Sequence, residues 1–247
     1  MDRIVHASLS AMRGAMARQA ATAHNLANAG TVGFRADMSA AQSTMLHVGG
    51  ELFGARASNQ ILSADMSAGT VTQTGRDMDV ALSGDAMLAV QAPNGDESYT
   101  RRGDLQVTDS GLVTTGDGHP VLGEGGPLTL PPADSVRIDN DGSVWVVPQG
   151  GDPANPTKVD RLKLASPTGS DVVKGVDGLF RVKGGGALPQ DPEARLTSKA
   201  LEGSNVNSTQ ALIDMIEASR AWDTQMNLIT SARELDTSAA DLMRIPS

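Results

Sequence analysis

The sequence predicts an α+β protein whose N- and C-terminal helices pair as a coiled coil, with an all-β antiparallel central domain inserted between them. Apolar residues repeat at heptad spacing near both ends of the chain. The middle instead alternates short Val-, Leu- and Thr-rich runs with turn signals. The expected organisation is a helix at 1–35, a connector at 36–75, a β domain at 76–185, a return connector at 186–205 and a helix at 206–247.

The first helix is predicted by a 4-3 spacing of residues, of which only one glutamine interrupts the apolar character. These positions are Val5, Leu9, Met12, Met16, Gln19, Ala23 and Leu26. The pattern ends at Asn28-Ala29-Gly30, a sequence typical of a helix stop.

The second helix follows a polar stretch at 204–208 that is rich in N-cap residue types. Its heptad positions are Leu212, Met215, Ser219, Trp222, Met226 and Ile229. Arginine dominates the charge of residues 1–35, whereas acidic residues dominate 200–247. Opposite charges beside two apolar seams favour pairing of the helices. Packing of each helix on the central domain is the alternative interpretation.

The β domain is predicted by apolar runs that turn residues separate. Val136 and Ile138 precede Asp141-Gly142, and Val144 and Val146 follow it, which indicates a hairpin with one apolar face. Several such runs in succession predict antiparallel pairing.

Composition excludes several classes of function. The net charge of −9 argues against nucleic acid and anionic membrane surfaces as partners. The absence of cysteine excludes disulfides, thiolate metal sites and cysteine nucleophiles. No run reaches the ~18 apolar residues of a membrane-spanning helix. Arg3, His6 and Arg13 interrupt the first residues, so we expect neither membrane insertion nor a cleaved signal peptide.

The sequence contains no constellation typical of catalysis, a cofactor or a metal. No two of the four histidines have metal-ligand spacing. Residues 139–152 resemble a calcium loop, but Val144 replaces the required glycine and Asp152 the final glutamate, so a hairpin turn is favoured. We therefore expect no enzyme activity, no cofactor and no metal site.

Three segments resemble the flagellar rod and hook family. Residues 23–35 (AHNLANAGTVGFR) are similar to its N-terminal motif, 201–207 (LEGSNVN) to its C-terminal signature, and 74–85 (TGRDMDVALSGD) to its central pattern. The chain length and residues 201–205 favour the proximal-rod type over the distal-rod type. His24 departs from the usual asparagine, and Ala86-Met87-Leu88 from a usual glycine followed by aromatics.

The resemblance implies a structural subunit of the proximal rod in the bacterial flagellar basal body. Such a subunit would leave through the flagellar type III export apparatus without a cleaved signal peptide. It would polymerise through its terminal helices into the periplasm-spanning axial drive shaft, with copies of itself and other rod proteins as partners. The alternatives are a distal-rod or hook subunit, and a soluble β-domain ligand-binding protein with helical oligomerisation arms.

We expect the assembly contacts at apolar positions of both helices: Val5, Leu9, Met12, Met16, Leu26, Leu212, Met215, Trp222, Met226 and Ile229. The family-motif residues form a second set. They are Asn25, Asn28, Gly33, Phe34, Asn205 and Asn207, and the first four are expected to shape the turn that leaves the first helix.

Overall fold

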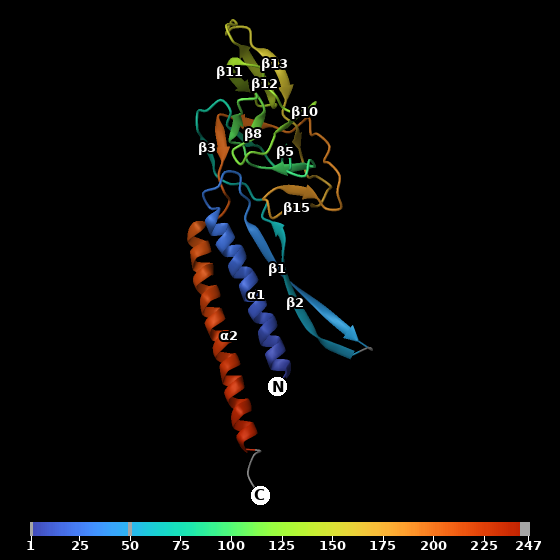
Figure 1. Cartoon of the computed structure of the whole chain (residues 1–247), viewed down its shortest axis with the longest axis vertical. Helices are drawn as coiled ribbons and strands as arrows, with labels where there is room; N and C mark the ends of the chain where they lie inside the picture. Colours follow the sequence, from blue (N-terminus) through green and yellow to red (C-terminus); the bar gives the residue numbers. More distant parts are fainter. Residues whose placement is uncertain (1, 49–50, 243–247) are drawn as a thin grey trace. The chain divides into compact units, whose positions relative to one another are not determined.

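The computed structural model describes residues 2–48 and 51–242 (Figure 1). They divide into two compact units. We call residues 2–27, 37–63 and 207–242 the helical unit, leaving aside positions 49–50, and residues 28–36 and 64–206 the β unit.

The helical unit contains α1 (Asp2–Ala27), β1 (Asp37–Val48), β2 (Glu51–Ala64) and α2 (Ser208–Leu242). The strands of the β unit are β3 (Val71–Gln73), β4 (Val80–Leu82), β5 (Met87–Gln91), β6 (Glu97–Thr100), β7 (Leu105–Val107), β8 (Val113–Thr115), β9 (Leu122–Gly123), β10 (Gly126–Pro127), β11 (Ala133–Ile138), β12 (Ser143–Pro148), β13 (Thr157–Arg161), β14 (Leu164–Ala165), β15 (Val172–Lys174), β16 (Phe180–Val182), β17 (Leu196–Ser198) and β18 (Ala200–Glu202).

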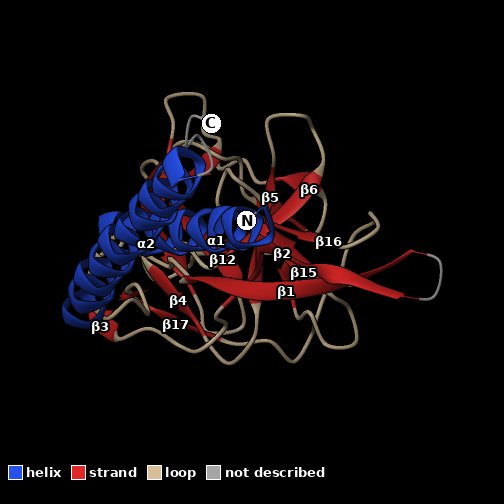
Figure 2. Ribbon diagram, turned by 90° about the horizontal axis from the view of Figure 1, so that it is seen from below, coloured by secondary structure: helices blue, strands red, loops and turns tan. Residues whose placement is uncertain are grey.

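The predicted fold class is wrong, because the described elements are mostly strands and the two helices form no coiled coil. α1 and α2 lie near each other in the helical unit (Figures 1 and 2). A coiled coil would bury the heptad side chains in holes of the partner helix. Met16, Leu212 and Met226 are instead 54%, 50% and 43% exposed. The heptad pattern predicted both helices, but it placed Met16, Leu212 and Met226 on the inward faces, where the structure does not have them.

The segment expected as a connector at 36–75 contains three strands. β1 and β2 pair with each other and form the long ribbon of the helical unit (Figure 2). β3 pairs with β18, which lies in the expected return connector at 186–205. Residues 37–48 are mostly small or polar and lack apolar alternation, so their pattern predicts no strand.

The β unit is built from antiparallel pairs. Its largest sheet has the order β14-β5-β6-β16-β15, and a three-stranded sheet has the order β11-β12-β13. Val136 pairs with Val146 and Ile138 with Val144 across the turn at Asp141-Gly142. This register confirms the hairpin that the alternating apolar residues predict.

Strand β5 separates two apolar clusters of the β unit. Leu88 and Val90 pack in the larger cluster, and Met87 and Ala89 in the smaller one, which also contains Tyr99. Successive side chains of a strand point to opposite faces. Because these four of the five β5 residues are fully buried, this strand is covered on both sides and anchors the core.

Candidate assembly surfaces

The two helices approach each other through small residues. Gly14, Ala15 and Ala21 are the buried positions of α1 among residues 11–27, and Ala211 is buried at the start of α2. Successive residues are about 100° apart around an α-helix. Met16 therefore points roughly opposite to Gly14, so this position of the heptad lies on the outward side of α1.

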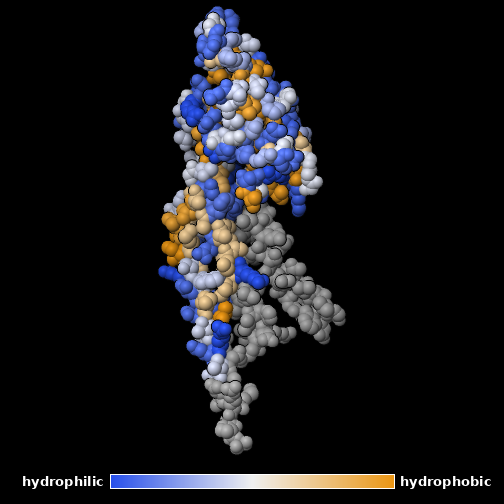
Figure 3. Space-filling model, viewed as in Figure 1, coloured by the Kyte–Doolittle hydropathy of each residue, from blue (hydrophilic) through white to orange (hydrophobic). Residues whose placement is uncertain are grey.

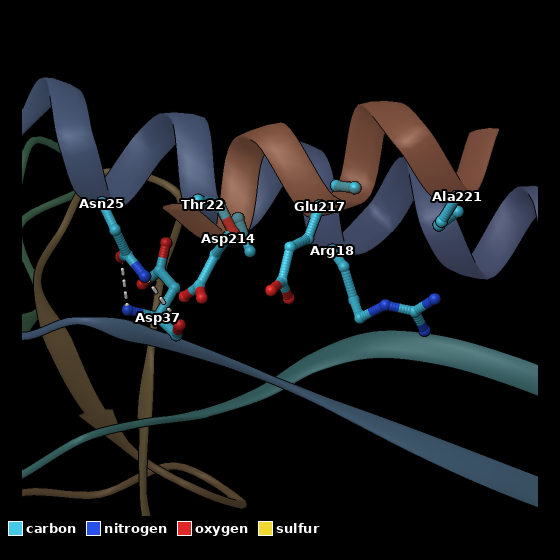
Figure 4. A pocket seen from close by; sticks show the side chains of 10 residues that line it. Arg18, Thr22, Asn25, Asp37, Asp214, Glu217 and Ala221 are labelled. Carbon is cyan, nitrogen blue, oxygen red and sulfur yellow. Dashed lines mark hydrogen bonds between the residues drawn. The ribbon is translucent and has the colours of Figure 1, made fainter. Parts of the chain in front are cut away.

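A groove of about 530 Å³ lies between α1, α2 and the start of β1 (Figure 4). Alanines from both helices line it together with Thr22 and Asn25. The side chains of Arg18, Asp214 and Glu217 point toward it (Figure 4). Asp214 accepts a hydrogen bond of 2.8 Å from Gln210. The groove is thus polar, with more negative than positive groups at its edge.

Asn25 and His24 join α1 to the first residue of β1. The Asn25 side chain donates to the Asp37 carbonyl at 3.0 Å and accepts from the Asp37 amide at 2.7 Å. The Nδ1 atom of His24 lies 2.5 Å from a carboxylate oxygen of Asp37. The histidine that departs from the family motif therefore contributes a second contact at the same junction.

The predicted assembly residues of α1 divide into three groups. Met16 is exposed, whereas Met12 and Leu26 are half-buried. The side chains of Val5 and Leu9 lie outside the described residues. Gln19 and Ala23, which complete the heptad, are exposed like Met16.

The predicted seam of α2 has the right period but is displaced by one residue at alternate positions. Met215, Trp222 and Ile229 are half-buried, whereas Leu212 and Met226 are exposed. The buried and half-buried positions form their own heptad row: Ala211, Met215, Ala218, Trp222, Gln225 and Ile229. A heptad pattern based on large apolar residues does not detect the two alanines and the glutamine of this row, so it selects the neighbouring residues instead.

An apolar patch remains exposed at the start of α2. Leu212, Ile213 and Ile216 are 50%, 45% and 55% exposed. Figure 3 shows apolar surface over this part of the helix. These side chains contribute to neither buried core cluster of the described residues.

A buried ion cluster around Glu202 lies in the β unit. One carboxylate oxygen of Glu202 is 2.8 Å from Arg35, and the other is 2.5 Å from Arg101. All three side chains are 1% exposed. The amide of Gly69 also donates to Glu202 at 2.8 Å. A single carboxylate therefore pairs with two buried guanidinium groups, and the three side chains together carry one net positive charge.

Both arginines also bind backbone carbonyls. Arg101 donates to the carbonyls of Leu82, Gly84 and Ala86 at 2.9, 2.7 and 2.6 Å. Arg35 donates to the carbonyl of Ser67. Burial is the largest cause that lowers the pKa of Arg35, and repulsion from Arg101 is the second. The Glu202 carboxylate opposes this shift.

Gly33 brings the N-terminal motif against the same cluster. Its amide donates to the carbonyl of Glu202 at 2.7 Å. Its φ of 65° lies in the region that favours glycine, and an added Cβ would overlap the backbone of Arg101. The motif requires glycine here for both reasons.

Asn205 links two other backbone segments of the β unit. Its side chain accepts from the Ala36 amide at 2.8 Å and donates to the carbonyls of Asp65 and Ser67 at 2.9 and 3.0 Å. These segments adjoin the points where the chain passes between its two units. The Asn205 side chain therefore joins its own segment to these two segments by hydrogen bonds.

The other family-motif residues have local roles. Asn28 accepts from the Thr31 hydroxyl at 3.1 Å in the turn after α1. Phe34 is buried beneath the Lys174 ammonium, which lies 3.8 Å from its ring centroid. Asn207 caps α2, because its side chain accepts from the amides of Thr209 and Gln210 at 3.1 Å.

Sequence reasoning missed the Arg35, Arg101 and Glu202 cluster. Arg35 and Glu202 stand in segments that resemble the family, but the motifs do not reveal that both residues meet Arg101. Among the described residues, no group of three or more His, Asp or Glu side chains is placed to hold a metal ion. No described helix is long and apolar enough to cross a membrane.

Two family models match parts of the chain. The model for the flagellar basal body rod FlgEFG protein C-terminal region matches residues 197–242. The model for the flagellar hook protein FlgE/F/G D1 domain matches residues 81–146. The first covers β17, β18 and α2, and the second covers a continuous part of the β unit.

Curated relatives extend over nearly the whole chain. The flagellar basal-body rod protein FlgF of Salmonella typhimurium is 39% identical over 98% of this chain and 99% of its own length. FlgF of Escherichia coli is 40% identical, covering 94% of each chain. The rod protein FlgG of Bacillus subtilis is 27% identical over 99% of this chain and 100% of its own.

The comparisons confirm the resemblance that the three sequence motifs predict. Similarity to the two FlgF proteins is higher than to FlgG at comparable coverage, so a FlgG-type assignment is not better supported. The chain belongs to the FlgF family of flagellar basal-body rod proteins.

Proposed function

We propose that the chain polymerises through the outward faces of its terminal helices to form part of the proximal rod, the inner section of the flagellar drive shaft. The observation that carries this proposal is the outward position of Met16 on α1. Met16 is 54% exposed, although it lies at the centre of the heptad. Burial of such surface between subunits would stabilise an assembly by roughly 25 cal/mol for each Å² of apolar area.

Of the predicted apolar residues, the proposed assembly contacts are those that the structure exposes: Met16, Leu212 and Met226. The partners are copies of the chain and other axial rod proteins. Export through the flagellar type III apparatus without a cleaved signal peptide, and a periplasm-spanning position, belong to the same proposal. The FlgF relatives are named basal-body rod proteins, which supports the proposed position in the rod.

The proposed role is structural rather than enzymatic. Glu202, the buried carboxylate of the cluster, already binds two arginines and a backbone amide. A general acid or base must reach the proton that it transfers. This carboxylate is committed to holding the β unit together.

A charged substitution on the outward face of α1 tests the proposal. Met16→Asp should prevent incorporation of the chain into purified hook–basal bodies and abolish swimming, because it places a charge in the proposed contact. Met16→Leu is the matched control, because it keeps an apolar side chain of similar size at the same position and should leave incorporation and swimming normal. Normal incorporation and swimming of the Met16→Asp variant would refute the proposal.

A further inference from the structure

The loop between β5 and β6 carries the only asparagine of the sequence that a glycine follows, Asn94-Gly95. Gln91 pairs with Glu97 at the base of this hairpin, so residues 92–96 form its loop. We propose that Asn94 is a site of spontaneous deamidation, which converts its side-chain amide into a carboxylate in the folded chain. This modification belongs to the β unit and does not depend on the proposed assembly surfaces.

The reaction is an attack by a backbone amide on the neighbouring side-chain amide. The backbone nitrogen of Gly95 bonds to the side-chain carbonyl carbon of Asn94 and gives up its proton to water. The bond from that carbon to Nδ2 breaks, and the nitrogen takes a proton from water and leaves as ammonia. Water then opens the succinimide ring at either carbonyl, which yields aspartate or isoaspartate. Because nucleophile and carbonyl belong to adjacent residues, the step is intramolecular and needs no further reactant than water.

Gly95 offers an unshielded nucleophile. It has no side chain beside its nitrogen, and a Cβ built at this position would meet no atom within 4 Å, which leaves room for the ring to form. The Gly95 amide donates to the carbonyl of Ala92 at 2.9 Å, and this hydrogen bond must open before the attack. Residues 93–96 are all exposed, so little buried surface opposes such a local opening.

Asp96 holds both ends of the Asn94 side-chain amide. The backbone amide of Asp96 donates to Oδ1 of Asn94 at 3.2 Å, and Nδ2 of Asn94 donates to the Asp96 carboxylate at 2.6 Å. Negative charge develops on Oδ1 when the carbonyl carbon is attacked, and a backbone N–H aimed at that oxygen stabilises the charge. The two hydrogen bonds therefore orient the amide and favour attack on its carbon.

Asn155 provides a comparison within the same unit. It is also exposed, its amide closes a turn with the carbonyl of Asp152, and its side chain donates to the Asp152 carboxylate at 3.0 Å. The residue that follows is Pro156, whose backbone nitrogen carries no hydrogen. Attack by that nitrogen cannot release a proton to give a neutral succinimide. Asn155 should therefore remain an amide while Asn94 reacts.

Deamidation weakens the loop in which it occurs. The hydrogen bond from Nδ2 of Asn94 to Asp96 is lost, and two carboxylates then face each other where the amide and the carboxylate were 2.6 Å apart. Isoaspartate also adds a methylene group to the main chain of the loop. Because β5 is buried on both sides and continues directly into this loop, we expect the modified chain to melt at a lower temperature.

Incubation of the purified full-length chain at mildly alkaline pH tests the proposal. Mass spectrometry of its peptides follows the mass increase from amide to acid at Asn94 and at Asn155. A methyltransferase specific for isoaspartate detects the isomer that the succinimide route produces and direct hydrolysis does not. We expect Asn94 to convert manyfold faster than Asn155, with isoaspartate among the products. Persistence of Asn94, equal rates at the two residues, or conversion without isoaspartate would overturn the proposal.

Two substitutions at Asn94 connect the modification to its effect on the hairpin. Asn94→Gln retains an amide but would have to close a larger ring, so it should stay unmodified and keep its melting temperature during the same incubation. Asn94→Asp reproduces one product and should melt at a lower temperature from the outset. The melting temperature of the unsubstituted chain should fall as Asn94 converts. An equal fall in the Asn94→Gln variant would place the reaction at another residue and overturn the assignment.

Discussion

Glu202 shows how one carboxylate can hold several segments of the β unit together. Its two oxygens bind Arg35, Arg101 and the amide of Gly69, and its own carbonyl accepts from Gly33. Replacement of a buried ion pair by apolar residues is often tolerated, but removal of one partner leaves an uncompensated charge. Loss of the carboxylate leaves two buried guanidinium groups that repel each other.

Glu202→Gln should therefore lower the free energy of unfolding of the chain by about 3–5 kcal/mol. Denaturant unfolding followed by tryptophan fluorescence measures this change. Glu193→Gln makes the same chemical substitution at an exposed position and should change stability by less than about 0.5 kcal/mol. Equal stability of the two variants would contradict the role assigned to Glu202.

Gly33→Ala should destabilise the β unit by more than about 1 kcal/mol, because the substitution combines an unfavourable φ with overlap against the Arg101 backbone. Gly75→Ala is the matched control. Gly75 has a similar φ of 77°, but its added Cβ would meet open space. The difference between the two variants in denaturant unfolding isolates the cost of the overlap, and a difference near zero would argue against it.

At the scale of the elements, the sequence predicted both helices and much of the β unit but not how the helices pack. Periodicity identified the heptads, and the hairpin around Asp141-Gly142 has the expected register. A hydrophobicity pattern gives most weight to large side chains such as Met16. The contact between α1 and α2 instead depends on glycine and alanine, whose contribution comes from their small size.

Enlarging one alanine tests which face of α1 points inward. Ala21 is 3% exposed on the inward face, so Ala21→Leu should destabilise the helical unit by about 1–3 kcal/mol through overpacking. Ala23 lies two residues away on the outward face, and Ala23→Leu should leave stability within about 0.5 kcal/mol of the original chain. Thermal melting of helical circular dichroism measures both. Equal melting would show that the inward face is misassigned.

The cap of α2 provides another test at this scale. The Asn207 side chain accepts hydrogen bonds from two amides that the helix itself leaves unpaired. Asn207→Ala should cost about 1 kcal/mol of helix stability, whereas Asn207→Ser should retain most of it. Similar helical melting of both variants would contradict the capping role.

At the scale of the whole molecule, the chain is a structural flagellar rod subunit of the FlgF family. The motifs in its sequence predicted this family, and the comparisons confirm the prediction. The ion cluster could not be predicted from the sequence, because Arg35, Arg101 and Glu202 are far apart in sequence and meet only after folding. The motif residues Gly33 and Asn205 hold backbone segments together, which leaves the outward helix faces as the proposed surfaces for assembly.

Quantitative mass spectrometry of purified hook–basal bodies, combined with labelling of the chain in electron micrographs, tests the central claim most directly. We expect the chain to co-purify with the rod in fixed proportion to the other rod proteins, with its label at the end of the rod nearest the inner membrane. Recovery of the chain only in the soluble fraction, with basal bodies that contain none of it, would contradict the account.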